Sequence, residues 1–330
     1  MTPKNLIIFD MDGVIIDVSG SYRDVVRQAT KLFFQPARSW EKLPQPLFEL
    51  SDLAVVKQSG GLNNDWDLTC AVINLLYSMT DRPAVYKSRK PWQRWQETLK
   101  QCDISGMAKF LTAEDQPLAT LLQHKGKHED DFIAGLYTGD VGSGNIIKQI
   151  FQELSLGQEL FASTYNLKPK LYRGDGYILR EKVLIDPTDL AALGRDNMLA
   201  IATGRPRAEA EYPLQHFDIK KYFNFIYTLD DCLEAEAKIL AAQGETVSLS
   251  KPNPFMLDAI AGVAKEKFRH YFYVGDMPDD MLAAANSRFG FKSIGLTVSA
   301  PDKSALENEL KRAGADFLAG SFDALKAIIL

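Results

Sequence analysis

A short apolar segment near the N-terminus, LIIFD at residues 6–10, lies far along the chain from the segments it most resembles. It ends in an acid, a pattern typical of a buried parallel strand whose C-terminal end carries functional groups. Similar segments come much later, at 199–203, 223–228, 271–276 and 293–297. A sheet built from all of them must therefore combine both ends of the chain.

Segments with apolar residues at helical spacing alternate with these later strands. They occupy residues 206–217, 254–268, 279–289 and 304–314. Strands that alternate with helices indicate βαβ units and a parallel sheet. The sequence therefore predicts an α/β fold with a Rossmann-like parallel sheet as its core.

The long stretch after the first strand has a different character. Helical spacing recurs at 21–34, 65–79, 116–124 and 145–154, with few strand-like runs. We therefore expect an α/β core domain formed by residues 1–17 and 184–330, and an inserted, mainly helical domain at 18–183. Near the end of the insertion, Asp175-Gly176 between short apolar runs predicts a hairpin-like turn.

Composition and charge exclude several classes of function. Of the 330 residues, 46% are hydrophobic and 25% charged, which is typical of a globular protein and not of a disordered chain. The formal net charge is −5, and no block rich in lysine or arginine occurs. We therefore expect neither a nucleic-acid partner nor a membrane partner, and small anionic or neutral metabolites remain open. The oligomeric state cannot be deduced.

The three cysteines, Cys70, Cys102 and Cys232, are far apart and form no C-x-x-C pair. Neither a disulfide framework nor a thiolate metal site is indicated, and a reducing, cytoplasmic location fits best. No segment has the apolar length that a membrane span requires.

Two acids, Asp10 and Asp12, directly follow the first predicted strand, and Gly13 permits a sharp turn after them. Neighbouring carboxylates at a strand end repel each other, and a divalent cation would relieve that repulsion. A hard ion such as Mg²⁺ prefers carboxylate and phosphate oxygens. Taken alone, the motif favours a helix-capping aspartate beside a solvated one over a metal site.

The segment YFYVGDMPDD at 271–280 repeats this design. Asp276 ends another buried strand, where a second metal ligand is needed. Asp279 and Asp280 fall in the first turn of the next predicted helix, where the helix dipole favours acids. Capping alone could therefore explain either of these two acids, and Asp279 is best interpreted as a cap.

Two further segments suit a phosphoryl group. Thr203 and Gly204 lie between a strand and a predicted helix, where a hydroxyl and free backbone N–H groups make an anion site. Lys251 precedes another helix and adds a positive charge, although a lone lysine is usually solvated. Arg205 follows the anion site and could either reach a substrate or lie on a helix surface.

Together, FDMDGV, IATGR, SKPNP and VGDMPDD resemble, in this order, the four motifs of the haloacid dehalogenase superfamily of phosphatases. The resemblance covers residues 1–17 and about 184–330, and the insertion looks like the helical cap of that superfamily. The segments GGLNNDWDLT and IATGRPRAEAEY further resemble a branch related to phosphoglycolate-phosphatase-like enzymes.

The resemblance implies a Mg²⁺-dependent phosphatase of a small phosphorylated metabolite. Asp10 would be the nucleophile that forms an aspartyl-phosphate, and Asp12 the general acid and base. Mg²⁺ would be held by Asp10, by the backbone carbonyl of Asp12 and by Asp276, with Asp280 as a ligand or a neighbour of one. The same resemblance assigns the phosphoryl oxygens to the Thr203 hydroxyl, the Gly204 N–H and Lys251.

In the insertion, Asn63 and Asn64 follow two glycines and precede an apolar helix. They are candidates for substrate contact, and an ordinary helix cap is the alternative. Two other functions remain open for the whole chain: a phosphosugar mutase on the same fold, and a non-catalytic metabolite-binding relative.

Overall fold

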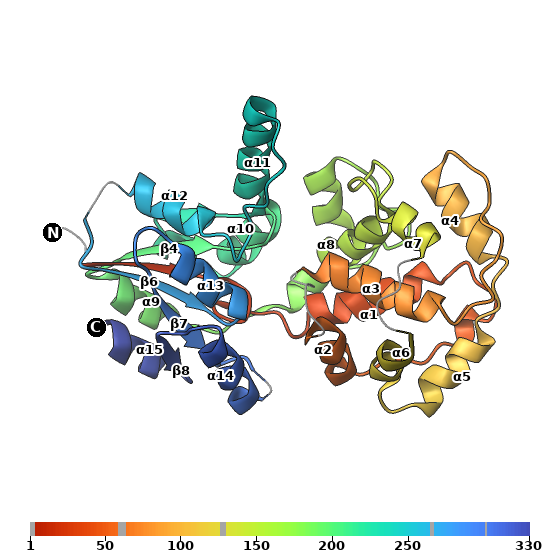
Figure 1. Cartoon of the computed structure of the whole chain (residues 1–330), viewed down its shortest axis with the longest axis horizontal. Coiled ribbons are helices and arrows are strands. Elements are labelled where there is room, and N and C mark those ends of the chain that lie inside the picture. The colour runs from red at the N-terminus through yellow and green to blue at the C-terminus, as the bar shows by residue number, and fades with distance from the viewer. Residues whose placement is uncertain (1–3, 59–63, 126–129, 265–266, 301) are drawn as a thin grey trace. The chain divides into compact units, whose positions relative to one another are not determined.

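The computed structural model describes residues 4–58, 64–125, 130–264, 267–300 and 302–330. It divides the chain into two compact units (Figure 1). One consists of Met1–Val18 and Glu181–Leu330, and the other of Ser19–Arg180.

The first unit is built on a six-stranded parallel sheet, which confirms the predicted α/β fold. Its strands are β1 (Asn5–Phe9), β4 (Met198–Ala202), β5 (Phe225–Tyr227), β6 (His270–Gly275), β7 (Lys292–Leu296) and β8 (Phe317–Ala319). Their order in the sheet is β5-β4-β1-β6-β7-β8, with every pair parallel. The N-terminal strand thus lies between two strands from the far end of the chain.

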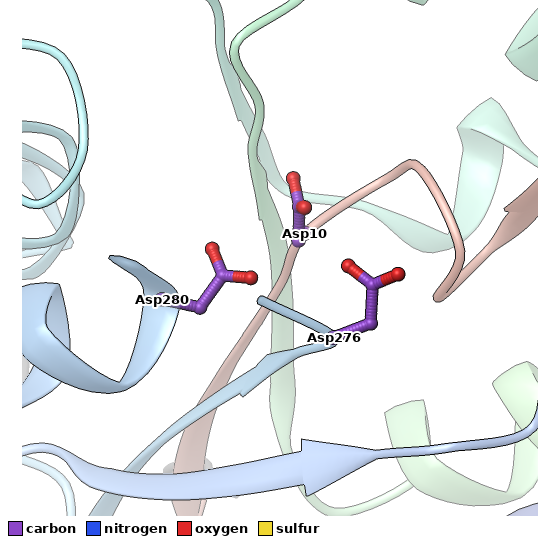
Figure 2. A group of neighbouring side chains, drawn as sticks. All are labelled: Asp10, Asp276 and Asp280. Atoms are coloured by element: carbon purple, nitrogen blue, oxygen red, sulfur yellow. The ribbon is translucent and has the colours of Figure 1, made fainter. Parts of the chain in front are cut away.

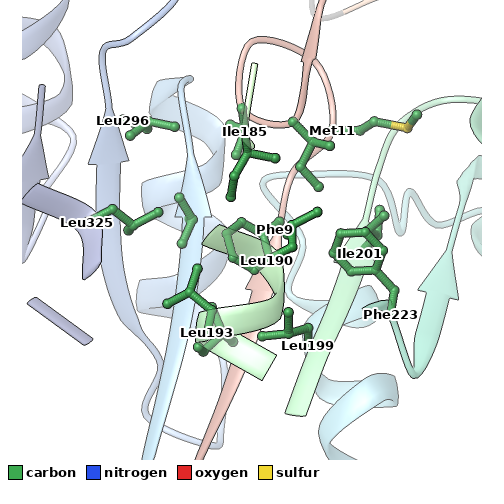
Figure 3. Close-up of a cluster of buried hydrophobic side chains, with 14 of the residues drawn as sticks. Phe9, Met11, Ile185, Leu190, Leu193, Leu199, Ile201, Phe223, Leu296 and Leu325 are labelled. Carbon is green, nitrogen blue, oxygen red and sulfur yellow. The ribbon is translucent and has the colours of Figure 1, made fainter. Parts of the chain in front are cut away.

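Helices cover both faces of this sheet because its central strand is apolar on both sides. Ile7 and Phe9 belong to one buried cluster, and Leu6 and Ile8 to the other. Figure 3 shows the first cluster, to which α9 (Pro187–Gly194), α10 (Arg207–His216) and α15 (Phe322–Ile329) contribute. The second cluster includes residues of α11 (Leu229–Gln243), α12 (Phe255–Val263) and α13 (Pro278–Asn286). Also in this unit are α14 (Lys303–Arg312) and the short 3₁₀ helix η3 (Lys220–Tyr222).

The strand register places the expected functional segments at one edge. Phe9 pairs with Ile201 of β4 and with Val274 of β6. The next residues along these three strands therefore emerge together at the carboxyl end of the sheet, where the strand order reverses and ligands bind in open α/β sheets.

A second, two-stranded sheet lies where the chain leaves and rejoins the first unit. Here β2 (Ile16–Asp17) pairs antiparallel with β3 (Lys182–Val183).

The second unit is helical in the described residues. It contains α1 (Tyr22–Phe33), α2 (Leu50–Gln58), α3 (Asp65–Tyr77), α4 (Pro91–Leu99), α5 (Ser105–Ala113), α6 (Pro117–Lys125), α7 (Asp131–Leu136) and α8 (Ile146–Tyr165), with the 3₁₀ helices η1 (Trp40–Lys42) and η2 (Tyr177–Arg180).

The hairpin predicted at Asp175-Gly176 is wrong. Asp175 instead forms an isolated antiparallel bridge with Gly157, which has φ 72° within the span of α8. A Cβ at Gly157 would lie 2.2 Å from the Gly176 nitrogen. The two glycines therefore serve the close approach of two backbones and not a tight turn.

No helix in the described part of the chain has the length and apolar character needed to cross a membrane. All three cysteines are free thiols.

Candidate active site

The first acid of the site, Asp10, extends directly from the end of β1. Its backbone N–H donates to the Val274 carbonyl of β6 at 2.8 Å, which continues the sheet by one residue. Its side chain is buried, and its Oδ1 lies 2.8 Å from the Lys251 Nζ. The sheet thus holds one carboxylate rigidly beside one ammonium group.

Three acids converge at this edge of the sheet (Figure 2). One carboxylate oxygen each from Asp10, Asp276 and Asp280 lies within 4.8 Å of the others. Two glycines make this possible. A Cβ on Gly275 would lie 2.3 Å from the Asp280 Cβ, and one on Gly13 would lie 2.0 Å from the Asp276 Oδ2.

Asp280 is fully buried and anchored on three sides. Its Oδ1 accepts from the Lys251 Nζ at 2.7 Å and from the Tyr273 hydroxyl at 2.9 Å, and its Oδ2 accepts from the Met277 N–H at 3.0 Å. The last contact caps α13, so this acid, rather than Asp279, makes the capping bond that the structure shows there. The sequence analysis missed Tyr273; its signal was a hydroxyl-bearing residue within an otherwise apolar strand.

The enclosed charges shift each other's protonation. Burial raises the pKa of Asp10 to about 7, with Lys251 lowering it and Asp280 raising it further. Burial, together with the charges of Asp10 and Asp280, raises the pKa of Asp276 well above its usual range. For Lys251, burial favours the neutral amine, but the two acids it contacts outweigh that effect and raise its pKa. One lysine therefore does not balance these acids.

The donor set fits a hard divalent cation. Carboxylate oxygens are the ligands that Mg²⁺ prefers, and a cation among them would offset the burial and the repulsion that raise the pKa values of Asp10 and Asp276.

The segment after β4 offers donors at the same edge. The Thr203 N–H continues the sheet by donating to the Tyr227 carbonyl at 3.0 Å, and its hydroxyl accepts from the Arg205 N–H at 3.1 Å. Gly204 is exposed, and a Cβ on it would meet no described atom within 4 Å. A hydroxyl and an accessible backbone N–H are the groups that bind phosphoryl oxygens.

Asp12 has a partner that the sequence did not reveal. The Nε and Nη2 of Arg205 both lie 2.6 Å from the Asp12 Oδ1. Arg205 is buried and also binds Glu181, which the sequence analysis missed. No local signal marked Glu181, because its role depends on a residue 24 positions away.

Of the two asparagines predicted to contact substrate, the structure describes Asn64 alone. Asn63 lies outside the described residues. Asn64 is the N-cap of α3: its Oδ1 accepts from the Asp67 N–H at 2.7 Å, and its Nδ2 donates to the Asp67 Oδ2 at 2.6 Å. The structure therefore shows the capping role for Asn64, and its contact with substrate stays a prediction.

Comparison with known proteins gives a consistent result. The sequence profile of the haloacid dehalogenase-like hydrolases matches residues 4–288. None of the curated proteins compared with the chain matches it significantly.

Solved structures resemble the chain over nearly its full length. An X-ray structure of target ZR25 of the Northeast Structural Genomics Consortium has a TM-score of 0.63 at 23% identity, covering 99% of this chain and 98% of that one. Phosphatase Tt82 from Thermococcus thioreducens has a TM-score of 0.51 at 18% identity, covering 93% and 99%. A candidate phosphoglycolate phosphatase from Lactobacillus delbrueckii subsp. bulgaricus has a TM-score of 0.51 at 15% identity, covering 100% and 99%. At these identities the likeness concerns the fold.

Proposed function

The chain belongs to the haloacid dehalogenase-like hydrolases, as its motifs indicated, and on that premise we propose that it is a Mg²⁺-dependent phosphatase of a small phosphorylated metabolite. The observation that carries the proposal is the convergence of Asp10, Asp276 and Asp280 beside Lys251 at the carboxyl end of the sheet. Some solved structures with the same fold are named phosphatases, which supports this reaction class.

Asp10 is the proposed nucleophile. Its carboxylate attacks phosphorus in line with the leaving oxygen and forms an aspartyl-phosphate, which divides one difficult hydrolysis into two easier displacements. The contact with Lys251 at 2.8 Å favours the ionised form that attack requires. The hydrogen bond from its backbone to β6 keeps the side chain in one place.

Asp12 is the proposed general acid and base. It protonates the leaving oxygen in the first step and takes a proton from the attacking water in the second. Its side chain is 35% exposed, whereas that of Asp10 is 8% exposed, so it is better placed to exchange protons with substrate and water.

The metal ligands would be Asp10, the backbone carbonyl of Asp12, Asp276 and Asp280. Mg²⁺ bound there supplies the positive charge that offsets these acids and the phosphoryl oxygens.

Thr203, Gly204 and Lys251 are the proposed phosphoryl-binding groups. The hydroxyl and the backbone N–H donate to phosphoryl oxygens. The ammonium group offsets the charge of these oxygens in the transition state of phosphoryl transfer. The helical unit is the proposed cap domain. A cytoplasmic location remains a prediction from the cysteine content.

The test is release of inorganic phosphate by the purified full chain with Mg²⁺, from a panel of phosphorylated metabolites and from p-nitrophenyl phosphate. We expect turnover by the wild type and a loss of roughly 10⁴-fold or more in Asp10→Asn, which keeps the shape and removes the attacking charge. Chelation should abolish turnover and Mg²⁺ should restore it.

Other outcomes point to the alternatives. Isomerisation of a sugar phosphate without release of phosphate would support a mutase. Tight binding of a metabolite without turnover of any would support a non-catalytic role. Activity near the wild-type level in Asp10→Asn would remove the nucleophile assignment.

A further inference from the structure

We propose that Arg205, held in place by Glu181, is a positioning residue that fixes the carboxylate of Asp12 for proton transfer. The inference rests on the proposed function, because it concerns the general acid and base of that reaction. It replaces a contact of Arg205 with substrate, which the sequence suggested, by a contact with a catalytic side chain.

The guanidinium group of Arg205 is enclosed. The arginine side chain is 2% exposed, and that of Glu181 is 1% exposed. Their contact is a two-point fork: Nη1 donates to Oε2 at 3.1 Å, and Nη2 donates to Oε1 at 2.9 Å. Nη1 also donates to the Glu209 carbonyl at 3.1 Å. These contacts fix the plane and the direction of the guanidinium group.

The remaining edge of the guanidinium group faces Asp12. Both Nε and Nη2 lie 2.6 Å from the same oxygen, Oδ1. Because these donors occupy Oδ1, the proton that Asp12 gives and takes belongs on Oδ2. The proton moves from Oδ2 to the leaving oxygen as the phosphorus–oxygen bond breaks and the bond to Asp10 forms. It returns to Oδ2 from water as the aspartyl-phosphate is hydrolysed.

Stability alone does not account for this arrangement. A buried ion pair gains little over well-packed apolar side chains, since desolvation offsets much of the attraction. Here the buried pair of Arg205 and Glu181 also contacts Asp12, a partly exposed acid close in sequence to the proposed nucleophile. A general acid must lie within hydrogen-bond reach of the leaving oxygen. Loss of the Arg205 contact that holds Asp12 should therefore lower the reaction rate more than it weakens substrate binding.

The experiment compares Arg205→Lys and Glu181→Gln with a matched control, Arg207→Lys. Arg207 lies two residues further along, is 42% exposed and pairs with Asp231 at 2.6 Å. Two substrates are used: the best alkyl phosphate from the panel, and p-nitrophenyl phosphate, whose leaving group needs little protonation. Thermal unfolding of each variant reports whether the fold survives.

We expect kcat for the alkyl phosphate to fall by about 100-fold in Arg205→Lys and by about 10-fold in Glu181→Gln, with KM changed by less than about threefold. With p-nitrophenyl phosphate, the first turnover should remain fast while the second step slows. The variants should therefore release a burst of p-nitrophenol close to one equivalent. Arg207→Lys should behave as the wild type does.

A second comparison separates positioning from folding. In an Asp12→Ala background, Glu181→Gln should cause no further loss of kcat, because it acts only through Asp12. An additional loss there, or a burst reduced in proportion to alkyl phosphate turnover, would overturn the proposal in favour of a structural role. Unchanged kinetics in both variants would also overturn it.

The wild type and Asp10→Asn are measured in the same series. Wild-type turnover that Asp10→Asn abolishes, together with unaffected Arg205 and Glu181 variants, contradicts the positioning role alone. Absence of wild-type turnover contradicts the proposed function, and the positioning role with it.

Discussion

Buried acids occur in both units, but their surroundings differ. In the helical unit, the carboxylate of Glu153 accepts from the backbone N–H groups of Lys170, Leu171 and Tyr172 at 2.8–3.1 Å. Asp52 likewise accepts from two backbone N–H groups at the start of α6. Each of these charges is met by donors from its own unit, and each fastens one segment to another.

In the first unit, the acids at the carboxyl end of the sheet face one another. Asp10, Asp276 and Asp280 have Lys251 as their nearby cation, and repulsion contributes to the raised pKa values of Asp10 and Asp276. The contrast teaches how to separate two uses of a buried acid. Glu153, whose carboxylate is matched by three backbone donors, stabilises the fold, whereas acids that repel one another lower stability until a cation binds.

Among the tests of this contrast between the two kinds of acid, the largest expected effect is on the metal requirement. Asp276→Asn should raise the Mg²⁺ concentration for half-maximal activity by at least about 100-fold, because even groups that only orient metal ligands are worth about 10–100-fold in affinity. Titration of activity with Mg²⁺ measures it. The matched acid-to-amide change Glu153→Gln should leave the Mg²⁺ requirement unchanged. An unaltered Mg²⁺ requirement in Asp276→Asn would mean that Asp276 is not a metal ligand, and Asp280 would be the next residue to test.

The same two variants should change stability in opposite directions. Glu153→Gln should lower the free energy of unfolding by about 3 kcal/mol, since an amide cannot accept from all the donors that the carboxylate meets. Asp276→Asn should raise the melting temperature in EDTA, because it removes a repelling charge. Urea and thermal unfolding measure these effects. A loss of stability in both variants would mean that the two kinds of acid do not differ.

The pH dependence of stability should follow from the raised pKa values. Because the pKa of Asp10 is about 7 in the folded chain against an ordinary 3.8, the folded state binds more protons between these values. Proton binding to Asp10 therefore stabilises the folded chain at low pH, and this part of the free energy of unfolding should be lost as pH rises from about 4 to 7. In EDTA, we expect the melting temperature to fall as pH rises from 5 to 8.

Addition of Mg²⁺ should raise the melting temperature more at pH 8 than at pH 5, because protons compete with the cation for the carboxylates. Asp276→Asn serves as the control and should flatten the pH dependence seen in EDTA. A wild-type melting temperature that rises steadily from pH 5 to 8 in EDTA would contradict the assigned repulsion.

The smallest effect is expected at Asn64. As the N-cap of α3, it should contribute about 1 kcal/mol, so Asn64→Ala should lower stability by that amount, and a capping role alone would leave kcat/KM unchanged. Urea unfolding and kinetics with two substrates check this. A tenfold loss on the metabolite with p-nitrophenyl phosphate hydrolysis retained would instead support the substrate contact predicted from the sequence.

Most strands of the six-stranded sheet were predicted, whereas β8 and several helices, among them α9 and α11, were missed. The strands that became β1 and β4–β7 were all predicted, because they are short apolar segments of a sheet buried on both faces. Helix α11 was missed: Leu233 and Leu240 are exposed, and Cys232 is its one fully buried residue among those described. Such a helix has no clear apolar stripe for a periodicity argument to detect.

The sequence by itself determined which acids and which hydroxyl follow the strands, and that Lys251 precedes a helix, because each such motif is local and parallel strands end at a common edge. Only the tertiary structure decided their partners. Arg205 binds Asp12, which is 193 residues away in the sequence. The Tyr273 hydroxyl in β6 donates to Asp280 in the first turn of α13. Such contacts depend on strand register and on the direction of each side chain. The hydrophobic periodicity of the sequence, two residues in a strand and 3.6 in a helix, does not specify which residues of different elements meet.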